Sequence, residues 1–127
     1  ENPTSRYAGV NAIEAPFILH HDGYYYLFVS WDYCCRGEKS TYRVVVGRSK
    51  EVYGPYVDRE GRPMYAGGGT PVIAGDGTNF EAAGHCAAYH FPDGDTFVCH
   101  GYSIPLHGQS ILVQRRMVWE DGWPKLR

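Results

Sequence analysis

The sequence has no long apolar run and no strong excess of charge of either sign. Its longest apolar stretches fall far short of the roughly 20 residues that a transmembrane helix needs, so no membrane-spanning segment is expected. Lys and Arg number 12 against 14 Asp and Glu, which gives a formal net charge of −2. A balanced charge provides no basic field to attract nucleic acid or an anionic membrane surface. We therefore predict neither nucleic acid nor a membrane as a partner.

Cysteine is scarce, and its spacing fits no metal site. The four cysteines are Cys34, Cys35, Cys86 and Cys99, a spacing that matches no zinc-binding pattern. Cys34 and Cys35 are predicted not to bridge, because a bond between adjacent residues strains the backbone. Cys86 and Cys99 are expected on neighbouring strands, offset from each other. The sequence therefore predicts four free thiols, which leaves the cellular compartment open.

Tyrosine and glycine, by contrast, are abundant. The chain of 127 residues contains 11 Tyr and 16 Gly, and aromatic residues make up 15%. This composition favours a turn-rich all-β domain over a helical or disordered chain. The length is sufficient for one small domain with a real core. Residues 1–10, ENPTSRYAGV, are polar and predict a loop with no secretory signal in this stretch.

The stretch from Asn11 to Ser30 predicts a β-hairpin. Asp22 and Gly23 separate two runs of aromatic and aliphatic residues. Asp-Gly is a strong hairpin signal, because both central residues of the favoured turn need a positive φ. Counting outward from this turn places Glu14 opposite Trp31, at the open end of the hairpin. An acidic residue among apolar neighbours at a strand end is either a solvated residue or a carboxyl held in a cleft.

A second hairpin repeats the first 71 residues further along the chain. Asp93 and Gly94 are predicted to form its turn, between strands at 85–91 and 96–102. A third strand is expected at 111–119, followed by another Asp-Gly turn and a short last strand. The shared strand order and turn type indicate an internal structural repeat.

The first repeat shows the same plan, with a third strand at 41–46 and a short fourth strand at 56–57. Four-stranded antiparallel repeats without intervening helices are typical of β-propeller blades, and a β-sandwich is the alternative. We predict a blade at 11–66, a connecting loop at 67–83 and a blade at 84–127. Because propellers have at least about four blades, the chain is predicted to be part of a larger propeller or to assemble with another chain.

Several short motifs, taken together, resemble one family of enzymes. The segments are AIEAPFILHHDGYYYLFVSWDYCCRG, STYRVVVGRSKEVYGPYVD, GGGTPV, AGHCAAYH and DGWP, in this order. They resemble the later blades of glycoside hydrolase family 43, specifically its endo-α-1,5-L-arabinanases. The resemblance implies a five-bladed propeller that hydrolyses arabinan with inversion. It also implies a secreted or extracytoplasmic protein, with the cytoplasm as the alternative.

The resemblance implies functions for individual residues. Glu14, in Ile-Glu-Ala-Pro, matches the family's general acid, and its apolar flanks favour the neutral carboxyl that this role needs. His85, in Gly-His, matches a residue near a metal ion, often calcium, which it contacts directly or through water. Trp31 and Tyr33 are candidates for stacking on sugar rings. The family's catalytic base and its orienting Asp belong to earlier blades and match no residue of this chain.

Two departures from the family pattern keep other functions open. Ala83 stands where the family usually has Pro, and Ser103 stands where an Asp is common. One alternative is a non-catalytic carbohydrate-binding or assembly module with a propeller fold. Another is an exo-acting xylosidase or arabinofuranosidase relative. The remaining blades, or a second chain, are expected as a partner, and the isolated chain is expected to be inactive.

Overall fold

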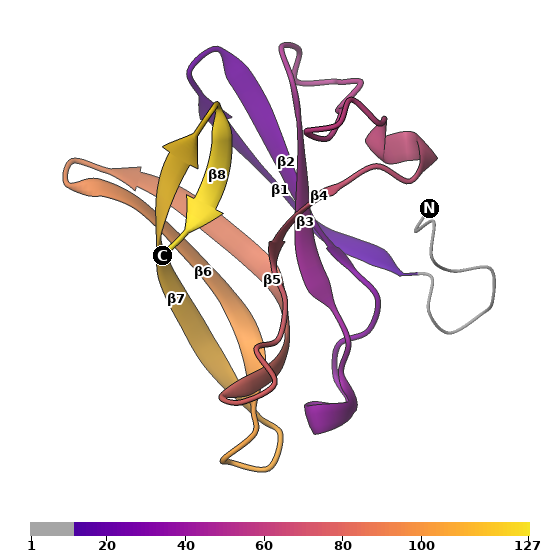
Figure 1. Cartoon of the computed structure of the whole chain (residues 1–127), viewed down its shortest axis with the longest axis vertical. Coiled ribbons are helices and arrows are strands. Elements are labelled where there is room, and N and C mark those ends of the chain that lie inside the picture. The colour runs from indigo at the N-terminus through magenta and orange to yellow at the C-terminus, as the bar shows by residue number, and fades with distance from the viewer. Residues whose placement is uncertain (1–11) are drawn as a thin grey trace.

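The computed structural model describes residues 12–127, which form two four-stranded antiparallel sheets (Figure 1). The first sheet consists of β1 (Ile13–His21), β2 (Tyr24–Trp31), β3 (Arg43–Ser49) and β4 (Thr70–Ile73). The second sheet consists of β5 (Phe80–Phe91), β6 (Gly94–Ser103), β7 (Gln109–Glu120) and β8 (Trp123–Leu126). Strands that are consecutive in the chain are neighbours in each sheet, which confirms the predicted repeat of two antiparallel meanders.

Helical structure in the described part of the chain is limited to two short 3-10 turns. These are η1 (Gly37–Lys39) and η2 (Met64–Ala66). Within residues 12–127, no helix has the length and apolar character needed to cross a membrane. The loop predicted at residues 1–10 and the blade start predicted at Asn11 lie outside the described residues.

The turn of the first hairpin is confirmed, whereas that of the second is shifted by one residue. Asp22 and Gly23 have φ values of 50° and 83°, positive at both positions as a type I′ turn requires. The second turn is formed by Pro92 and Asp93, and Gly94 already belongs to β6. Proline favours the first central position of a turn, because its ring fixes φ near about −65°. The two hairpins are therefore 70 residues apart rather than 71.

The fourth strand of the first sheet is β4, and the strand predicted at 56–57 is wrong. That segment contributes only isolated bridges, whereas β4 pairs with β3 from within the connecting loop predicted at 67–83. A side-chain carbon added at Gly69, directly before β4, would lie 2.8 Å from atoms of both Trp31 and Val45. The missing side chain at Gly69 allows this close approach to the sheet.

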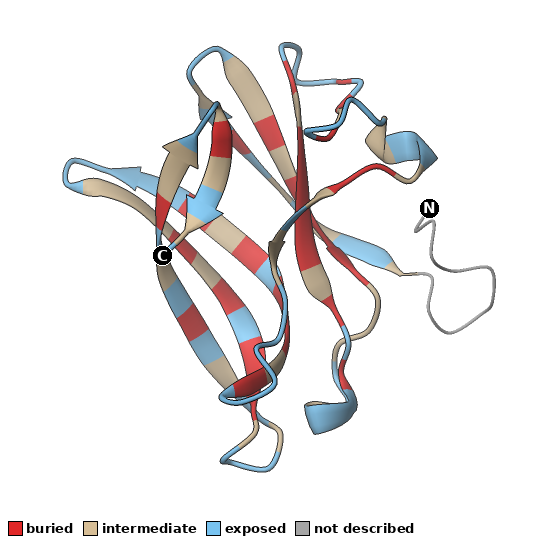
Figure 2. Cartoon of the chain, viewed as in Figure 1, coloured by how far each residue is buried: buried red, intermediate tan, exposed pale blue. Residues whose placement is uncertain are grey.

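The main hydrophobic core lies between the two sheets. Phe28 of β2 and Phe97 of β6 are both fully buried there, with ring centroids 6.0 Å apart. Val44, Val46 and Ala88 belong to the same buried cluster. Figure 2 shows buried positions alternating with exposed ones along the strands of the second sheet, as expected for strands with one packed face. The two sheets therefore share one core.

The cysteines divide into a bonded pair and two buried thiols. Cys86 and Cys99 are free and buried in the core between the sheets. Burial raises the pKa of Cys86 to about 12 and that of Cys99 to about 11, so both thiols stay protonated and unreactive. Cys34 and Cys35 form a disulfide with each other, which contradicts the prediction of four free thiols. The backbone of Cys35 has a φ of 69°, a left-handed conformation in which the two adjacent side chains meet.

Asp58 holds the loop between β3 and β4 in place. Its buried carboxylate accepts hydrogen bonds from the backbone N–H groups of Arg62 at 2.8 Å and Gly69 at 3.0 Å. The Arg62 guanidinium adds an ion pair at 3.1 Å. Burial alone would raise the pKa of this carboxyl, but the hydrogen bonds and the charge of Arg62 outweigh it, and the pKa lies below its usual range. The carboxylate form therefore stabilises the folded loop.

We expect Asp58→Asn to lower the free energy of unfolding by about 1–3 kcal/mol at neutral pH, because buried N–H groups lose a charged acceptor. The folded pKa is depressed, so this contribution is complete above the unfolded pKa of about 3.9 and is lost as the pH falls through the folded pKa. Urea unfolding of both proteins should show a difference that shrinks in acid. Glu60→Gln, at a side chain that is 63% exposed, is the control and should stay within about 0.5 kcal/mol. Equal losses in both variants would contradict this assignment.

Candidate active site

Glu14 lies at the start of β1, where a β-bulge changes the predicted register. The two strands pair as predicted near the turn, but Glu14 lies opposite Ser30 and not opposite Trp31. The register shifts between Glu14 and Phe17, and Ala15 has a φ of 53°. The bulge adds one residue to β1 and thereby turns Glu14 toward the face that Ser30 occupies. The Glu14 residue is exposed in the chain.

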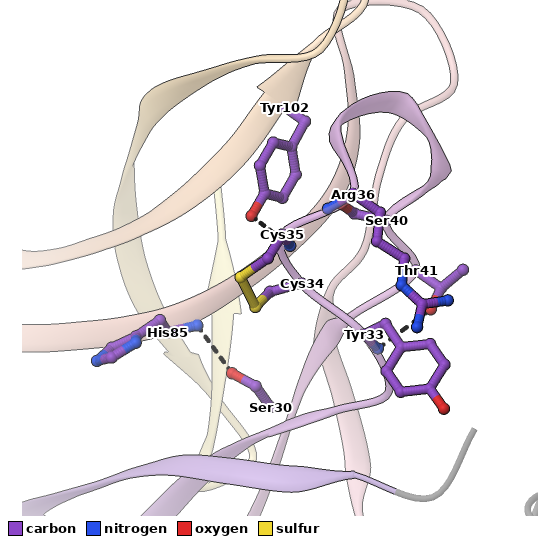
Figure 3. The surroundings of a disulfide bond; sticks show 9 residues. All are labelled: Ser30, Tyr33, Cys34, Cys35, Arg36, Ser40, Thr41, His85 and Tyr102. Atoms are coloured by element: carbon purple, nitrogen blue, oxygen red, sulfur yellow. Dashed lines mark hydrogen bonds between the residues drawn. A yellow bond between two sulfur atoms is a disulfide. The ribbon is translucent and has the colours of Figure 1, made fainter. Parts of the chain in front are cut away.

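His85 occupies a matching bulge at the equivalent position of the second sheet. Its φ is also 53°, and the register of β5 against β6 shifts between Gly84 and Ala87. The backbone N–H of His85 donates a 2.8 Å hydrogen bond to Oγ of the fully buried Ser30 (Figure 3). Ser30, in β2, therefore contacts both bulges: it pairs with Glu14 of β1, and its hydroxyl accepts the hydrogen bond from His85. Bulges are frequent beside active sites, because they redirect side chains.

Tyr42 fills the space beneath these two bulges. It is 3% exposed and clusters with Ala82 and Tyr102 of the second sheet. Burial raises the pKa of the Tyr42 hydroxyl, and Tyr102 and the Glu14 carboxylate raise it further. The Glu14 carboxylate therefore lies near enough to the Tyr42 hydroxyl for its charge to act on it. Tyr42 also fixes the chain before His85, because its carbonyl accepts a 2.9 Å hydrogen bond from the N–H of Ala83.

The disulfide loop after β2 lies beside Ser30 and His85, as Figure 3 shows. The N–H of Cys35 donates a 2.7 Å hydrogen bond to the Tyr102 hydroxyl, which ties the loop to the second sheet. Within the loop, the N–H of Arg36 donates to Oγ of Ser40 at 2.9 Å. Sequence reasoning missed this bonded loop, although the Cys34-Cys35 doublet was its signal. The disulfide restricts the loop beside Ser30 and His85.

The two aromatic residues predicted to bind sugar lie at the end of β2 and in the loop that follows it. Trp31 is 8% exposed and packs with Val29 and Val45, on the face of the first sheet that points away from the second sheet. Tyr33 is half-buried in the disulfide loop, and the guanidinium of Arg36 lies 4.0 Å from its ring centroid. Stacking of either residue on a sugar stays a prediction.

His85 by itself does not form a calcium site. Its exposed ring lies 5.7 Å from that of His100, centroid to centroid. Calcium prefers oxygen ligands, usually six to eight, and imidazole supplies nitrogen. Within residues 12–127, the one group of three His, Cys, Asp or Glu side chains close enough to share an ion lies elsewhere and excludes His85. In the described part of the chain, His85 is therefore not joined by two further side chains of these types that could share an ion with it.

Gly84, directly before His85, packs so closely against the ring of Tyr42 that no side chain fits there. A side-chain carbon at Gly84 would lie 2.4 Å from two ring atoms of Tyr42, so Gly84→Ala is expected to destabilise the protein by about 1–3 kcal/mol through overpacking. The same change in a Tyr42→Ala background should cost far less, because the ring is gone. Urea unfolding of this double-mutant cycle gives the coupling between the two positions. An equal cost in both backgrounds would contradict the proposed clash.

Two adjacent four-stranded antiparallel meanders that share one core define a pair of β-propeller blades. Residues 2–124 match the family described as Glycosyl hydrolases family 43, and the chain belongs to that family. The resemblance drawn from its motifs is thereby confirmed.

Three relatives are close in sequence or structure. An extracellular exo-α-(1→5)-L-arabinofuranosidase of Cellvibrio japonicus is 45% identical over 94% of this chain and 34% of its own length. An extracellular endo-α-(1→5)-L-arabinanase of Bacillus subtilis is 39% identical over 89% of this chain and 34% of its own length. The structure of a Cellvibrio cellulosa α-L-arabinanase in complex with arabinohexaose is 45% identical and superposes with a TM-score of 0.87, over 91% of this chain and 36% of that one. The chain spans about a third of the length of the curated relatives it matches.

Proposed function

We propose that the complete protein is an inverting endo-α-1,5-L-arabinanase, to which this chain supplies the general acid, Glu14. The main support is that Glu14 lies exposed at a bulge opposite Ser30, which accepts a hydrogen bond from His85. The relatives named arabinanase support arabinan as the substrate. Glu14 protonates the oxygen of the leaving sugar as the glycosidic bond breaks, while a water molecule attacks from the opposite side.

The base that activates this water is proposed to come from the rest of the propeller. Inverting glycosidases hold two carboxyl groups roughly 6.5–9.5 Å apart, so that the water fits between them. This chain supplies the acid half of that arrangement. A calcium ion near His85, contacted through water and held by oxygen ligands from other parts of the protein, belongs to the same proposal.

The outer face of the first sheet is proposed to seat the preceding blade. An apolar groove of about 350 Å³ lies on this face. Its lining includes Leu27, Val29, Trp31, Met64 and Tyr65, and Tyr65 is 75% exposed. Exposed apolar surface of this kind is typical of an interface. The chain covers only about a third of the length of its curated relatives, so we propose that a blade from the rest of the complete propeller occupies this groove.

We also propose that the complete protein is secreted. The two curated relatives are named extracellular, and a disulfide such as Cys34–Cys35 persists in an oxidising compartment. Detection of the protein only in the cytoplasmic fraction of its source cells would contradict this.

Hydrolysis of linear arabinan by the complete protein and by this chain alone tests the proposal. An endo-acting enzyme should release a ladder of oligosaccharides early in the reaction, and the first product observed by NMR should have the inverted anomeric configuration. An exo-acting enzyme, the second candidate because of the Cellvibrio japonicus relative, would release one short product throughout. The chain alone should show no activity, since it lacks the base and the cleft. Arabinan binding without hydrolysis by the complete protein would indicate a non-catalytic module.

A further inference from the structure

A cluster of three potential metal ligands joins the two sheets at the end of the strands opposite Glu14. His21 ends β1 in the first sheet, whereas His90 and Asp95 flank the turn between β5 and β6 in the second. One ring nitrogen of each histidine and one carboxylate oxygen of Asp95 all lie within 4.8 Å of one another. Seven residues of strand, or roughly 20 Å, separate His21 from Glu14, so the cluster is distinct from the candidate active site.

We propose that His21, His90 and Asp95 bind one divalent transition-metal ion of the zinc type, which links the two sheets. Two imidazoles and a carboxylate with a water molecule as fourth ligand make a common tetrahedral zinc set. Nitrogen ligands favour zinc over calcium or magnesium, which select oxygen. With zinc–ligand bonds of about 2.0–2.2 Å, tetrahedral ligands lie roughly 3.3 Å apart. His90 Nδ1 and Asp95 Oδ1 are 2.8 Å apart, so a small opening of this pair admits the ion.

The carbonyl of His20 and the indole of Trp119 orient the three proposed ligands. Metal-binding histidines usually direct their second ring nitrogen to a carbonyl or carboxylate, which fixes the ring. Nε2 of His90 lies 2.9 Å from the carbonyl oxygen of His20, on the other sheet. The second carboxylate oxygen of Asp95 accepts a 2.8 Å hydrogen bond from Nε1 of Trp119. The ring of His21 stacks on Trp119, with centroids 3.8 Å apart and an interplanar angle of 9°.

Trp119 is therefore a positioning residue for two of the three ligands. It orients the Asp95 carboxylate through its indole N–H and holds His21 by stacking. Trp119→Phe keeps an aromatic ring but removes the N–H, and loss of such an outer partner lowers metal affinity by roughly 10–100-fold. Loss of a direct ligand should exceed this range.

Zinc titration of the metal-free protein by calorimetry tests the proposal, with cobalt absorption as a second measurement. We expect the parent protein to bind one zinc ion per chain and to give the absorption spectrum of tetrahedral cobalt. His90→Gln and Asp95→Asn should each lose the zinc binding and the cobalt spectrum. His107→Asn is the matched control, because His107 is exposed in another loop and Asn tolerates its φ of 55°. This variant should bind zinc as the parent does.

Circular dichroism verifies that each variant is folded. His90 has a side chain that is 44% exposed, so His90→Gln should fold even if Asp95→Asn does not, and it decides the question. No zinc uptake by the parent protein would overturn the proposal, as would uptake that is unchanged in folded His90→Gln. An octahedral cobalt spectrum would also overturn it.

Discussion

Glu14→Gln in the complete protein is expected to lower the turnover of linear arabinan by roughly 10²–10⁴-fold, the usual contribution of a positioned general acid. Gln has nearly the same shape as Glu but cannot donate a proton to the leaving oxygen. The fold should be unaffected, because the Glu14 residue is exposed at the start of β1. Release of reducing ends from linear arabinan measures the effect.

Substrates with different leaving groups distinguish the loss of acid catalysis from a general loss of activity. An activated aryl arabinoside, if the site accepts it, needs little protonation, so Glu14→Gln should lose far less activity on it than on arabinan. Glu120→Gln is the matched control, since Glu120 is an exposed residue at the end of β7 that pairs with Lys125. It should keep full activity. Full activity of Glu14→Gln on arabinan would remove this residue from the mechanism.

Phe28→Ala is expected to destabilise both sheets together, by about 3–5 kcal/mol. The Phe28 ring is fully buried between the sheets, and its centroid lies 6.0 Å from that of Phe97. Removal of the ring leaves a cavity in the core that the two sheets share, and the packed backbones on each side can close it only in part. A loss of this size is a large fraction of the stability of a typical domain.

Hydrogen exchange, followed peptide by peptide, measures this effect in each sheet separately. Amides of β2 and of β6 should both lose protection in Phe28→Ala, because the ring contacts both sheets. Leu112→Ala is the control, because Leu112 lies in β7 but is 65% exposed, and its protection should hardly change. Loss of protection confined to the first sheet would show that the two blades unfold independently.

The sequence could predict the features that short segments determine. Asp22-Gly23 specifies a type I′ turn by itself, because both residues adopt a positive φ at little cost. The runs of aromatic and aliphatic residues on each side then predict the strands. The second turn shows the limit of this reasoning. Pro92 was the local signal that moved it by one residue, and the Asp-Gly pair that follows had suggested another position.

The family motifs singled out Glu14 and His85 as predicted site residues, but they could not predict the surroundings of either residue. Each residue lies at a β-bulge, and the bulge of His85 donates a hydrogen bond to Ser30 of the other sheet, a contact that exists only when the sheets are packed together. The same holds for β4, which comes from a glycine-rich segment with little strand character of its own. Its pairing with β3 depends on the close approach that Gly69 allows.

By itself, the sequence determined the all-β class, the repeated meander, the first turn and the family, because these depend on local turn chemistry, on runs of aromatic and aliphatic residues and on motifs read in order. The tertiary structure alone decided the bulge register of Glu14, the bonded pair Cys34–Cys35, and the meeting of His21 with His90. The physical reason is that these contacts arise when backbone conformation or sheet packing brings groups together. His21 and His90 are 69 residues apart in the chain, and no local pattern connects them.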